Sequence, residues 1–229
     1  MFDAKVHTFK AAYMQRIQDY VRLGYCSYVA GEVPLKKAQD LVRKFVQYYR
    51  VDLNQNARNR AKRKGEGVAT FLMYRQKNAE LIHWILLVSK GEHPAYKLER
   101  LRDAIDKQQR IKLTGYELVR LTREGAEKPS WTWQMTSENY QGWRDRIINT
   151  VRTGDVDKVE KMLQTLYATP GFSGSRKQVK KLAQLYKNEW VRSRGKEKRP
   201  SLQRMYYLNR QKSETESLYG LLGKNATSG

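Results

Sequence analysis

The feature that most constrains the fold is the apolar run LIHWILLV, which extends from Leu81 to Val88. Every residue in it except His83 is hydrophobic, so a strand formed here would be apolar on both faces. Such a strand must be covered on both sides, because an exposed apolar face would meet water. The run is also much shorter than the roughly 20 apolar residues that a membrane-spanning helix needs. It therefore predicts a central, covered strand in a sheet.

Strand-like and helix-like segments alternate around this run. Segments rich in β-branched and aromatic residues predict strands at 26–33, 68–76, 81–90, 111–122 and 131–136. Amphipathic segments predict helices at 34–50 and 94–108. The first six elements follow the order of ferredoxin-like and RRM-like sandwiches. We therefore predict an α+β fold with a ferredoxin-like β-α-β-β-α-β sheet and one added strand.

Further helices are expected before and after this sheet. Apolar residues recur at helical spacing over 5–23 and predict an N-terminal helix. From Ser137 the pattern is helical again, with Asp155 as a helix cap and another helix over 176–194. The sequence thus predicts three regions: an α+β core at 1–136, a helical extension packed on it at 137–194, and a basic linker with a flexible tail at 195–229.

The chain carries a large excess of positive charge. Its 45 Lys and Arg residues against 23 Asp and Glu give a formal net charge of +22. Such a chain repels itself on compaction, and a polyanionic partner would offset this repulsion. Nucleic acid is the first candidate partner; an anionic membrane surface and a general effect on solubility are alternatives. The single cysteine, Cys26, and the absence of a secretory pattern favour a reducing compartment, the cytoplasm or the nucleus.

Basic residues gather in one run and on two helix faces. The run from Arg58 to Lys64 has the composition of a solvent-exposed loop. The helices at 34–50 and 176–194 each carry cations opposite an apolar stripe. Several runs of one sign favour a phosphate-binding surface whose affinity falls as salt rises. The candidate nucleic-acid-binding residues are Arg58, Arg60, Lys62, Arg63 and Lys64 of the loop, Lys36, Arg43 and Lys44 of the first helix, and Arg176, Lys177, Lys180, Lys181, Lys187, Arg192 and Arg194 of the second.

The segment KGEGVATF, from Lys64 to Phe71, partly resembles the first RNP motif of RRM proteins. An RRM binds bases by stacking them on aromatic rings of this motif. Here Glu66 and Val68 occupy the two positions where those rings stand. We therefore expect that the sheet does not bind RNA in the manner of an RRM.

The three histidines, His7, His83 and His93, show no metal-ligand spacing. The place of His83 in the central strand resembles rolling-circle initiators and relaxases, which have two histidines there and a tyrosine nucleophile on a later helix. The second histidine position is Ile85, and Tyr186 is one of several tyrosines on later helices. We interpret His83 as a core or edge histidine and assign no catalytic residue, metal or cofactor.

The sequence therefore predicts a non-catalytic nucleic-acid-binding protein, with RNA or single-stranded DNA favoured, that holds the phosphate backbone with its basic surfaces. A ribonucleoprotein or replication assembly, with other protein subunits and no membrane, is the expected setting. Two alternatives stay open: a metal-dependent or metal-independent nuclease or nicking enzyme on a ferredoxin-like scaffold, and an adaptor or inhibitor that binds an acidic protein. It is also open whether Trp131 and Trp133 stack bases or pack the core.

Overall fold

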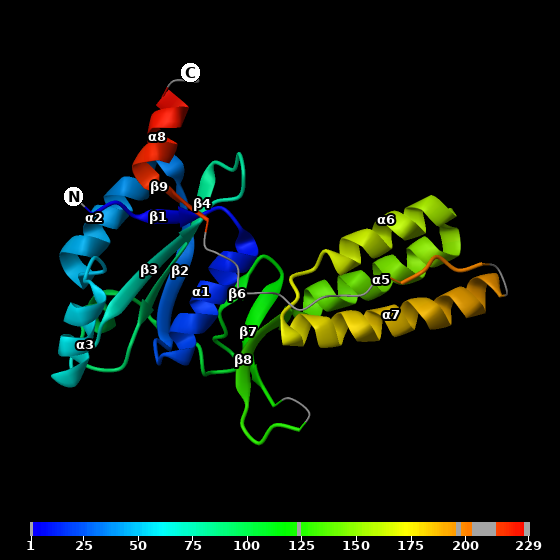
Figure 1. The fold of residues 1–229 in the computed structure, drawn as a ribbon, viewed down its shortest axis with the longest axis horizontal. Coiled ribbons are helices and arrows are strands. Elements are labelled where there is room, and N and C mark those ends of the chain that lie inside the picture. The colour runs from blue at the N-terminus through cyan, green and yellow to red at the C-terminus, as the bar shows by residue number, and fades with distance from the viewer. Residues whose placement is uncertain (1, 123–124, 196–197, 203–213, 227–229) are drawn as a thin grey trace. The chain divides into compact units, whose positions relative to one another are not determined.

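The structure, a computed structural model, describes residues 2–122, 125–195, 198–202 and 214–226. The chain has a mixed α+β fold and forms two compact units (Figure 1). Unit 1 contains residues 1–110 and 210–229, and unit 2 contains residues 111–209. The boundary expected at residue 136 therefore does not coincide with the division at 110. In the described ranges, no helix is both long enough and apolar enough to cross a membrane.

Unit 1 is built on a mixed six-stranded sheet with the order β5-β2-β4-β3-β1-β9. As predicted, the apolar run forms a central strand, β4 (Leu81–Val88), which pairs antiparallel with both β2 and β3. The edge strand β9 pairs antiparallel with β1, which is itself parallel to β3. The remaining strands are β1 (Lys5–His7), β2 (Ser27–Pro34), β3 (Ala69–Tyr74), β5 (Arg102–Asp103) and β9 (Thr215–Ser217).

Helices connect these strands. Pro34 precedes a 3₁₀ turn at Leu35–Lys37, as expected for a residue whose missing N–H costs nothing at a helix start. The helices of unit 1 are α1 (Lys10–Arg22), α2 (Ala38–Tyr49), α3 (Gln55–Arg63), α4 (Ala95–Leu98) and α8 (Leu218–Ala226).

The ferredoxin-like order is not confirmed. The predicted order began with the strand at 26–33, and the structure differs from it because α3 follows α2 between β2 and β3 and because the strand expected at 111–122 is not part of this sheet. Segment 5–23, expected as one helix, starts with a strand because Val6 and His7 pair in parallel with Met73 and Tyr74.

The prediction of a helix at 94–108 was also wrong. Only α4, a single turn, forms there, and the chain becomes extended at Glu99. Arg102 and Asp103 then pair with β2 as the short strand β5. Leu98 and Ile105, which suggested an apolar helix face, are exposed. Pairing with the edge of the sheet thus overrides a helical pattern that had no surface to cover.

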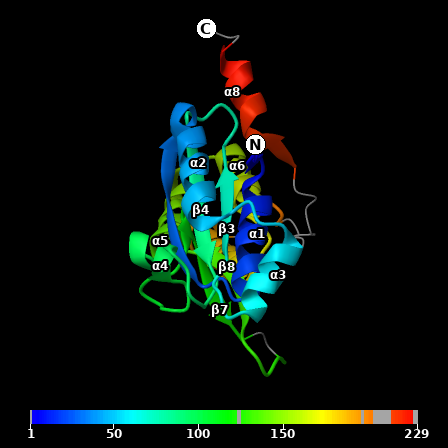
Figure 2. The same cartoon turned by 90° about the vertical axis from the view of Figure 1, so that its left-hand side faces the viewer.

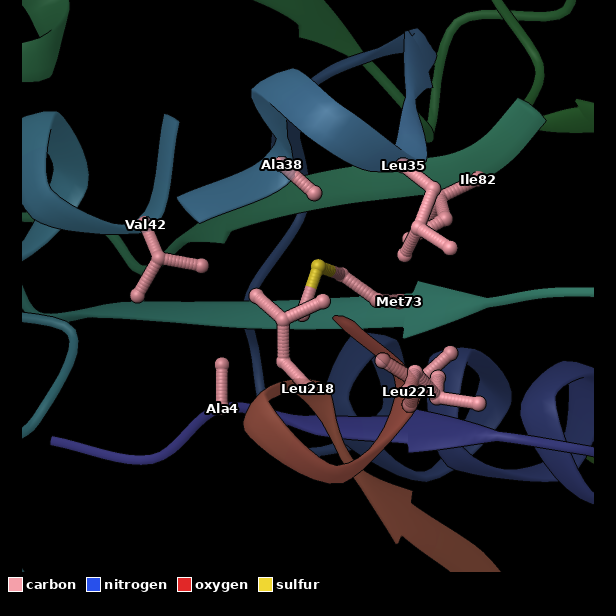
Figure 3. Close-up of a cluster of buried hydrophobic side chains, with 9 residues drawn as sticks. Ala4, Leu35, Ala38, Val42, Met73, Ile82, Leu218 and Leu221 are labelled. Atoms are coloured by element: carbon pink, nitrogen blue, oxygen red, sulfur yellow. The ribbon is translucent and has the colours of Figure 1, made fainter. Parts of the chain in front are cut away.

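The sheet of unit 1 is covered on both faces. Figure 2 shows α2 lying along the sheet, and Ala38 and Val42 of this helix pack against Met73 of β3 (Figures 2 and 3). On β3 the next residue, Tyr74, stacks on Tyr13 of α1 with ring centres 5.6 Å apart. Because consecutive strand residues point to opposite faces, α1 and α2 cover opposite sides of the sheet.

The end of the chain returns to this sheet. A flexible tail was expected, but β9 pairs with β1, and Leu218 and Leu221 of α8 are buried in the cluster of Figure 3. The prediction of a flexible tail overlooked Leu218 and Leu221. Two buried leucines can hold a short helix in place. The parts of the expected linker and tail at 196–197, 203–213 and 227–229 lie outside the described residues.

Unit 2 combines a small antiparallel sheet with three helices. The strands expected at 111–122 and 131–136 do not join the main sheet; they form a three-stranded sheet with the order β6-β7-β8. Asp155 caps the second helix as predicted, because its carboxylate accepts the N–H of Lys158 at 2.8 Å. The elements are β6 (Lys112–Leu113), β7 (Tyr116–Leu121), β8 (Ser130–Met135), α5 (Ser137–Thr153), α6 (Val156–Tyr167) and α7 (Ser173–Arg194).

Local contacts explain two features of unit 2. Thr114 and Gly115 both have positive φ and form the two-residue turn that separates β6 from β7. The first two turns of α7 lie against β8, where the side-chain amide of Gln178 accepts the N–H of Met135 at 2.7 Å and donates to its carbonyl oxygen at 3.0 Å. Gln178 therefore satisfies backbone groups at the edge of β8 that would otherwise need another strand.

Candidate nucleic-acid interface

The basic run at 58–64 is helical, not a loop. Asn54 caps α3 by accepting the N–H of Ala57 at 2.9 Å, and Gly65, with φ of 80°, follows the end of the helix. The helix buries Ala61 and leaves most of its cations exposed. The loop prediction failed because it considered the charge of the run and not the capping residue that precedes it.

Two of the five cations in this run are used inside the fold. Arg58 is half-buried and its Nη2 donates to the carbonyl oxygen of Val51 at 2.8 Å. Lys62 places its ammonium nitrogen 4.2 Å from the centre of the Tyr25 ring. Burial raises the pKa of Tyr25, and the nearby Arg58 partly opposes this rise. Arg58 and Lys62 therefore fix α3 to the rest of unit 1.

The other three cations line a hollow with a fourth that sequence analysis missed. Arg60, Arg63 and Lys64 share with Arg50 an open cavity of about 560 Å³. Arg50 follows α2 in the left-handed conformation, with φ of 51°, which ends that helix. In the described part of the chain, none of these four cations forms an ion pair. The carboxylate residue Glu66 also lines the cavity.

The candidate residues on and before α2 are exposed, but two of them have acidic partners. Nη2 of Arg43 lies 3.2 Å from Oδ1 of Asp40, and Nζ of Lys44 lies 3.0 Å from Oε1 of Glu99. The hydroxyl of Tyr49 also donates to Glu99, at 2.5 Å. Lys36, in the 3₁₀ turn, is exposed. The Glu99 contacts connect α2 to the segment after α4, so Lys44 has a structural role.

In unit 2, the middle of α7 presents a stripe of lysines. Lys177, Lys180 and Lys181 are exposed and lie on one side of the helix at spacings of three and four residues. Arg176 and Lys187 are half-buried. Val179, Leu182 and Tyr186 fill the opposite face, as the amphipathic pattern predicts.

The C-terminal cations of α7 are engaged within unit 2. Glu189 is buried and accepts from Arg152 at 2.6 Å and from Arg192 at 2.5 Å. The hydrogen bond from Arg192 is the main reason that the pKa of Glu189 falls to about 2. Arg194 donates to the carbonyl oxygens of Val151 and Gly154. Arg152 and Arg194 therefore stabilise the packing of α5 and α7, and Arg192 holds Glu189 within α7.

The similarity of KGEGVATF to an RNP motif has a structural explanation within the core. A Cβ atom on Gly67 would lie 3.0 Å from the carbonyl oxygen of Gly91, so glycine allows two loops to pack closely. Phe71 meets Phe45 of α2 edge-on, with ring centres 5.0 Å apart. The ring of Phe71 therefore packs under α2 and does not form a surface for bases.

Neither sequence nor structure comparison adds a relative. No family model matches the chain, and no curated protein or solved structure was found to be significantly similar to it.

The aromatic candidates differ in how deeply they are buried. Trp133 is completely buried and lies against Phe172, whereas Trp131 is half-buried beside the guanidinium of Arg120. Trp133 therefore packs the core. Tyr186 is also buried, and its hydroxyl donates to the carbonyl oxygen of Pro200 at 3.1 Å, so it is not placed to act as a nucleophile.

Proposed function

We propose that the protein binds nucleic acid through the cationic hollow formed by α3 and Arg50. The observation that carries this proposal is the grouping of Arg50, Arg60, Arg63 and Lys64 around one cavity without ion-pair partners in the described residues. Like charges held together repel one another, and phosphate groups that enter the cavity would relieve this repulsion.

The type of side chain supports phosphate as the ligand. Three of the four cations are arginines, whose planar guanidinium group forms paired hydrogen bonds to phosphate oxygens. The cavity is open, so it suits a chain that passes over the surface more than a small molecule that must be enclosed. The mixed lining with Glu66 favours hydrogen-bond donors and acceptors together, as sugar and phosphate supply.

RNA or single-stranded DNA is the favoured ligand, and the lysine stripe of α7 is a second contact surface. A flexible strand can follow a short cationic hollow and bind to further charges elsewhere on the protein. A cytoplasmic or nuclear protein, alone or in a larger nucleoprotein assembly, fits this activity.

The test is a titration of the full-length protein with labelled single-stranded RNA, single-stranded DNA and duplex DNA of one sequence, at 50 mM and 200 mM salt. The proposal predicts tighter binding of a single strand than of the duplex, with an affinity that falls as salt rises. Equal, weak binding of all three at both salt concentrations would contradict it and would favour the acidic protein partner.

A further inference from the structure

A row of polar side chains crosses the sheet of unit 1. Glu32 of β2 is paired with His83 of β4, His83 with Tyr74 of β3, and Tyr74 with His7 of β1. Directly paired residues point to the same face of a sheet, so the four side chains lie side by side. Tyr13 of α1 contacts both His7 and Tyr74, which places the row on the face that α1 covers.

Exposure rises along this row. His7 and Tyr74 are buried, whereas the side chain of His83 is 23% exposed and that of Glu32 is 51% exposed. Burial, helped by the charge of Arg16, lowers the pKa of His7 to about 4, so this imidazole is neutral and enclosed. Only the end of the row formed by His83 and Glu32 is accessible to a ligand.

His83 is also the one histidine whose ring is both oriented and open. His93 accepts the N–H of Ala95 at Nδ1, and its Nε2 contacts the carbonyl oxygen of Tyr49 at 3.3 Å, so both nitrogens are used. In contrast, Nδ1 of His83 lies 3.1 Å from Oε1 of Glu32, and no described residue bonds to Nε2.

The contacts of His83 favour one form of its ring. A carboxylate can only accept a hydrogen bond from the neutral imidazole. Glu32 therefore holds the proton on Nδ1 and leaves the lone pair on Nε2. The ring also stacks on Tyr74, with centres 5.8 Å apart and planes inclined by 13°. An imidazole with one nitrogen held by a carboxylate and the other open is the arrangement of a general base.

A lysine begins the helix that covers this row. Lys10 follows His7 after two residues and is the first residue of α1, one turn before Tyr13. Lys10 is half-buried, and burial lowers its pKa to about 8. Lys10 therefore follows β1 in the chain, and β3 separates β1 from β4, the strand that carries His83.

We propose that His83 is a catalytic general base, positioned by Glu32, in a site that cleaves RNA at a 2′-hydroxyl group. This inference rests on the nucleic-acid binding proposed above and goes beyond it. RNA is the substrate that needs least from the protein, because its nucleophile is part of the ligand. Glu32, which pairs with His83, lies five residues along β2 from Ser27, roughly 17 Å, a distance that a few nucleotides can span.

The reaction balances with these groups and water. Nε2 of His83 takes the proton of the 2′-hydroxyl, and the 2′-oxygen forms a bond to phosphorus. The bond from phosphorus to the 5′-oxygen breaks, and the leaving oxygen takes a proton from solvent. His83 then returns its proton to solvent. The products are a strand ending in a 2′,3′-cyclic phosphate and a strand beginning with a 5′-hydroxyl.

The experiment incubates the full-length protein with a labelled single-stranded RNA and measures binding and cleavage in the same samples. A matched strand has one 2′-deoxy position at the cleaved linkage. We expect cleavage of the RNA, a product ending in a cyclic phosphate, and no cleavage at the deoxy position. His83→Gln should lower the rate constant by about 100-fold or more while RNA affinity stays within about twofold.

Glu32→Gln tests the positioning role, with Glu80→Gln, another exposed carboxylate, as the matched control. Glu32→Gln should lower kcat with little change in KM, and Glu80→Gln should change neither.

Three results would overturn the inference. If RNA binds but remains intact, the proposed catalytic site is rejected and the binding proposal is unaffected. Cleavage that continues unchanged in His83→Gln, or that occurs equally at the deoxy position, would show that His83 does not activate a 2′-hydroxyl. RNA that does not bind at all would instead reject the proposed function, and the binding measurement distinguishes this case.

Discussion

The ammonium nitrogen of Lys62 lies 4.2 Å from the centre of the Tyr25 ring, on a helix whose other cations line an open hollow. This contact divides a run of five cations into two groups. Arg58 and Lys62 hold α3 in place, whereas Arg60, Arg63 and Lys64 remain available to a ligand. The division gives a direct way to separate stability from binding.

Lys62→Gln should destabilise unit 1 and leave nucleic-acid affinity nearly unchanged. A cation over an aromatic ring at the surface contributes about 0.5–1 kcal/mol. Arg63→Gln removes the same charge from the hollow, so it should weaken binding and leave the unfolding midpoint unchanged. Urea denaturation and a binding titration on both variants test this pair, and a reversed pattern would show that the two groups are wrongly assigned.

Gly174→Ala should destabilise unit 2. A Cβ atom there would lie 2.6 Å from the carbonyl oxygen of Trp133, so α7 would have to move away from β8. We expect a loss of about 1–3 kcal/mol. Gly142→Ala on α5 is the control, because its Cβ meets no atom within 4 Å and should stabilise the helix by about 0.5–1 kcal/mol. Thermal denaturation distinguishes the two variants.

Glu189 should make unit 2 sensitive to acid. Its folded pKa of about 2 is below the ordinary value of 4.5, so its contribution to stability is complete above about pH 5 and is lost as pH falls toward 2. Glu189→Gln lacks this contribution. The difference in melting temperature between the wild type and this variant should therefore be largest near neutral pH and shrink between pH 5 and pH 2. A constant difference would mean that packing, not charge, is lost.

Leu218→Ala should release the C-terminal helix from unit 1. Leu218 is buried beside Ala4 and Met73, and the truncation of a buried leucine costs about 2–5 kcal/mol. Tyr219→Ala, at a neighbouring exposed position, should cost much less. Hydrogen exchange of the β1 and β9 amides would report the release, and equal exchange in both variants would contradict it.

Sequence reasoning succeeded where a pattern is decided locally. The apolar run at 81–88 became the central strand, the stripe of α2 became buried, and Asp155 became a cap. Each of these depends on hydrophobic spacing or on one side chain and its near neighbours.

It failed where distant segments decide the outcome. The strand Lys5–His7 exists because β3 lies beside it, and β9 exists because β1 offers a free edge. The same holds for the candidate sites. Arg50 joins the hollow only because the chain turns after α2, and Glu32 meets His83 only through the register of β2 and β4. No local pattern connects these residues in the sequence.

The central claim is that the hollow of α3, and not net charge alone, binds nucleic acid. The most direct measurement is the salt dependence of single-stranded RNA affinity for two double variants with equal loss of charge: Arg60→Gln with Arg63→Gln, and Arg43→Gln with Lys44→Gln. The first pair lines the hollow, whereas the second pair has acidic partners.

We predict that the hollow variant binds more weakly and that its salt slope falls by about 0.7 for each cation removed, while the control variant stays close to wild type. Equal losses in both variants would contradict it, because they would show that the positive charge acts only as a general field.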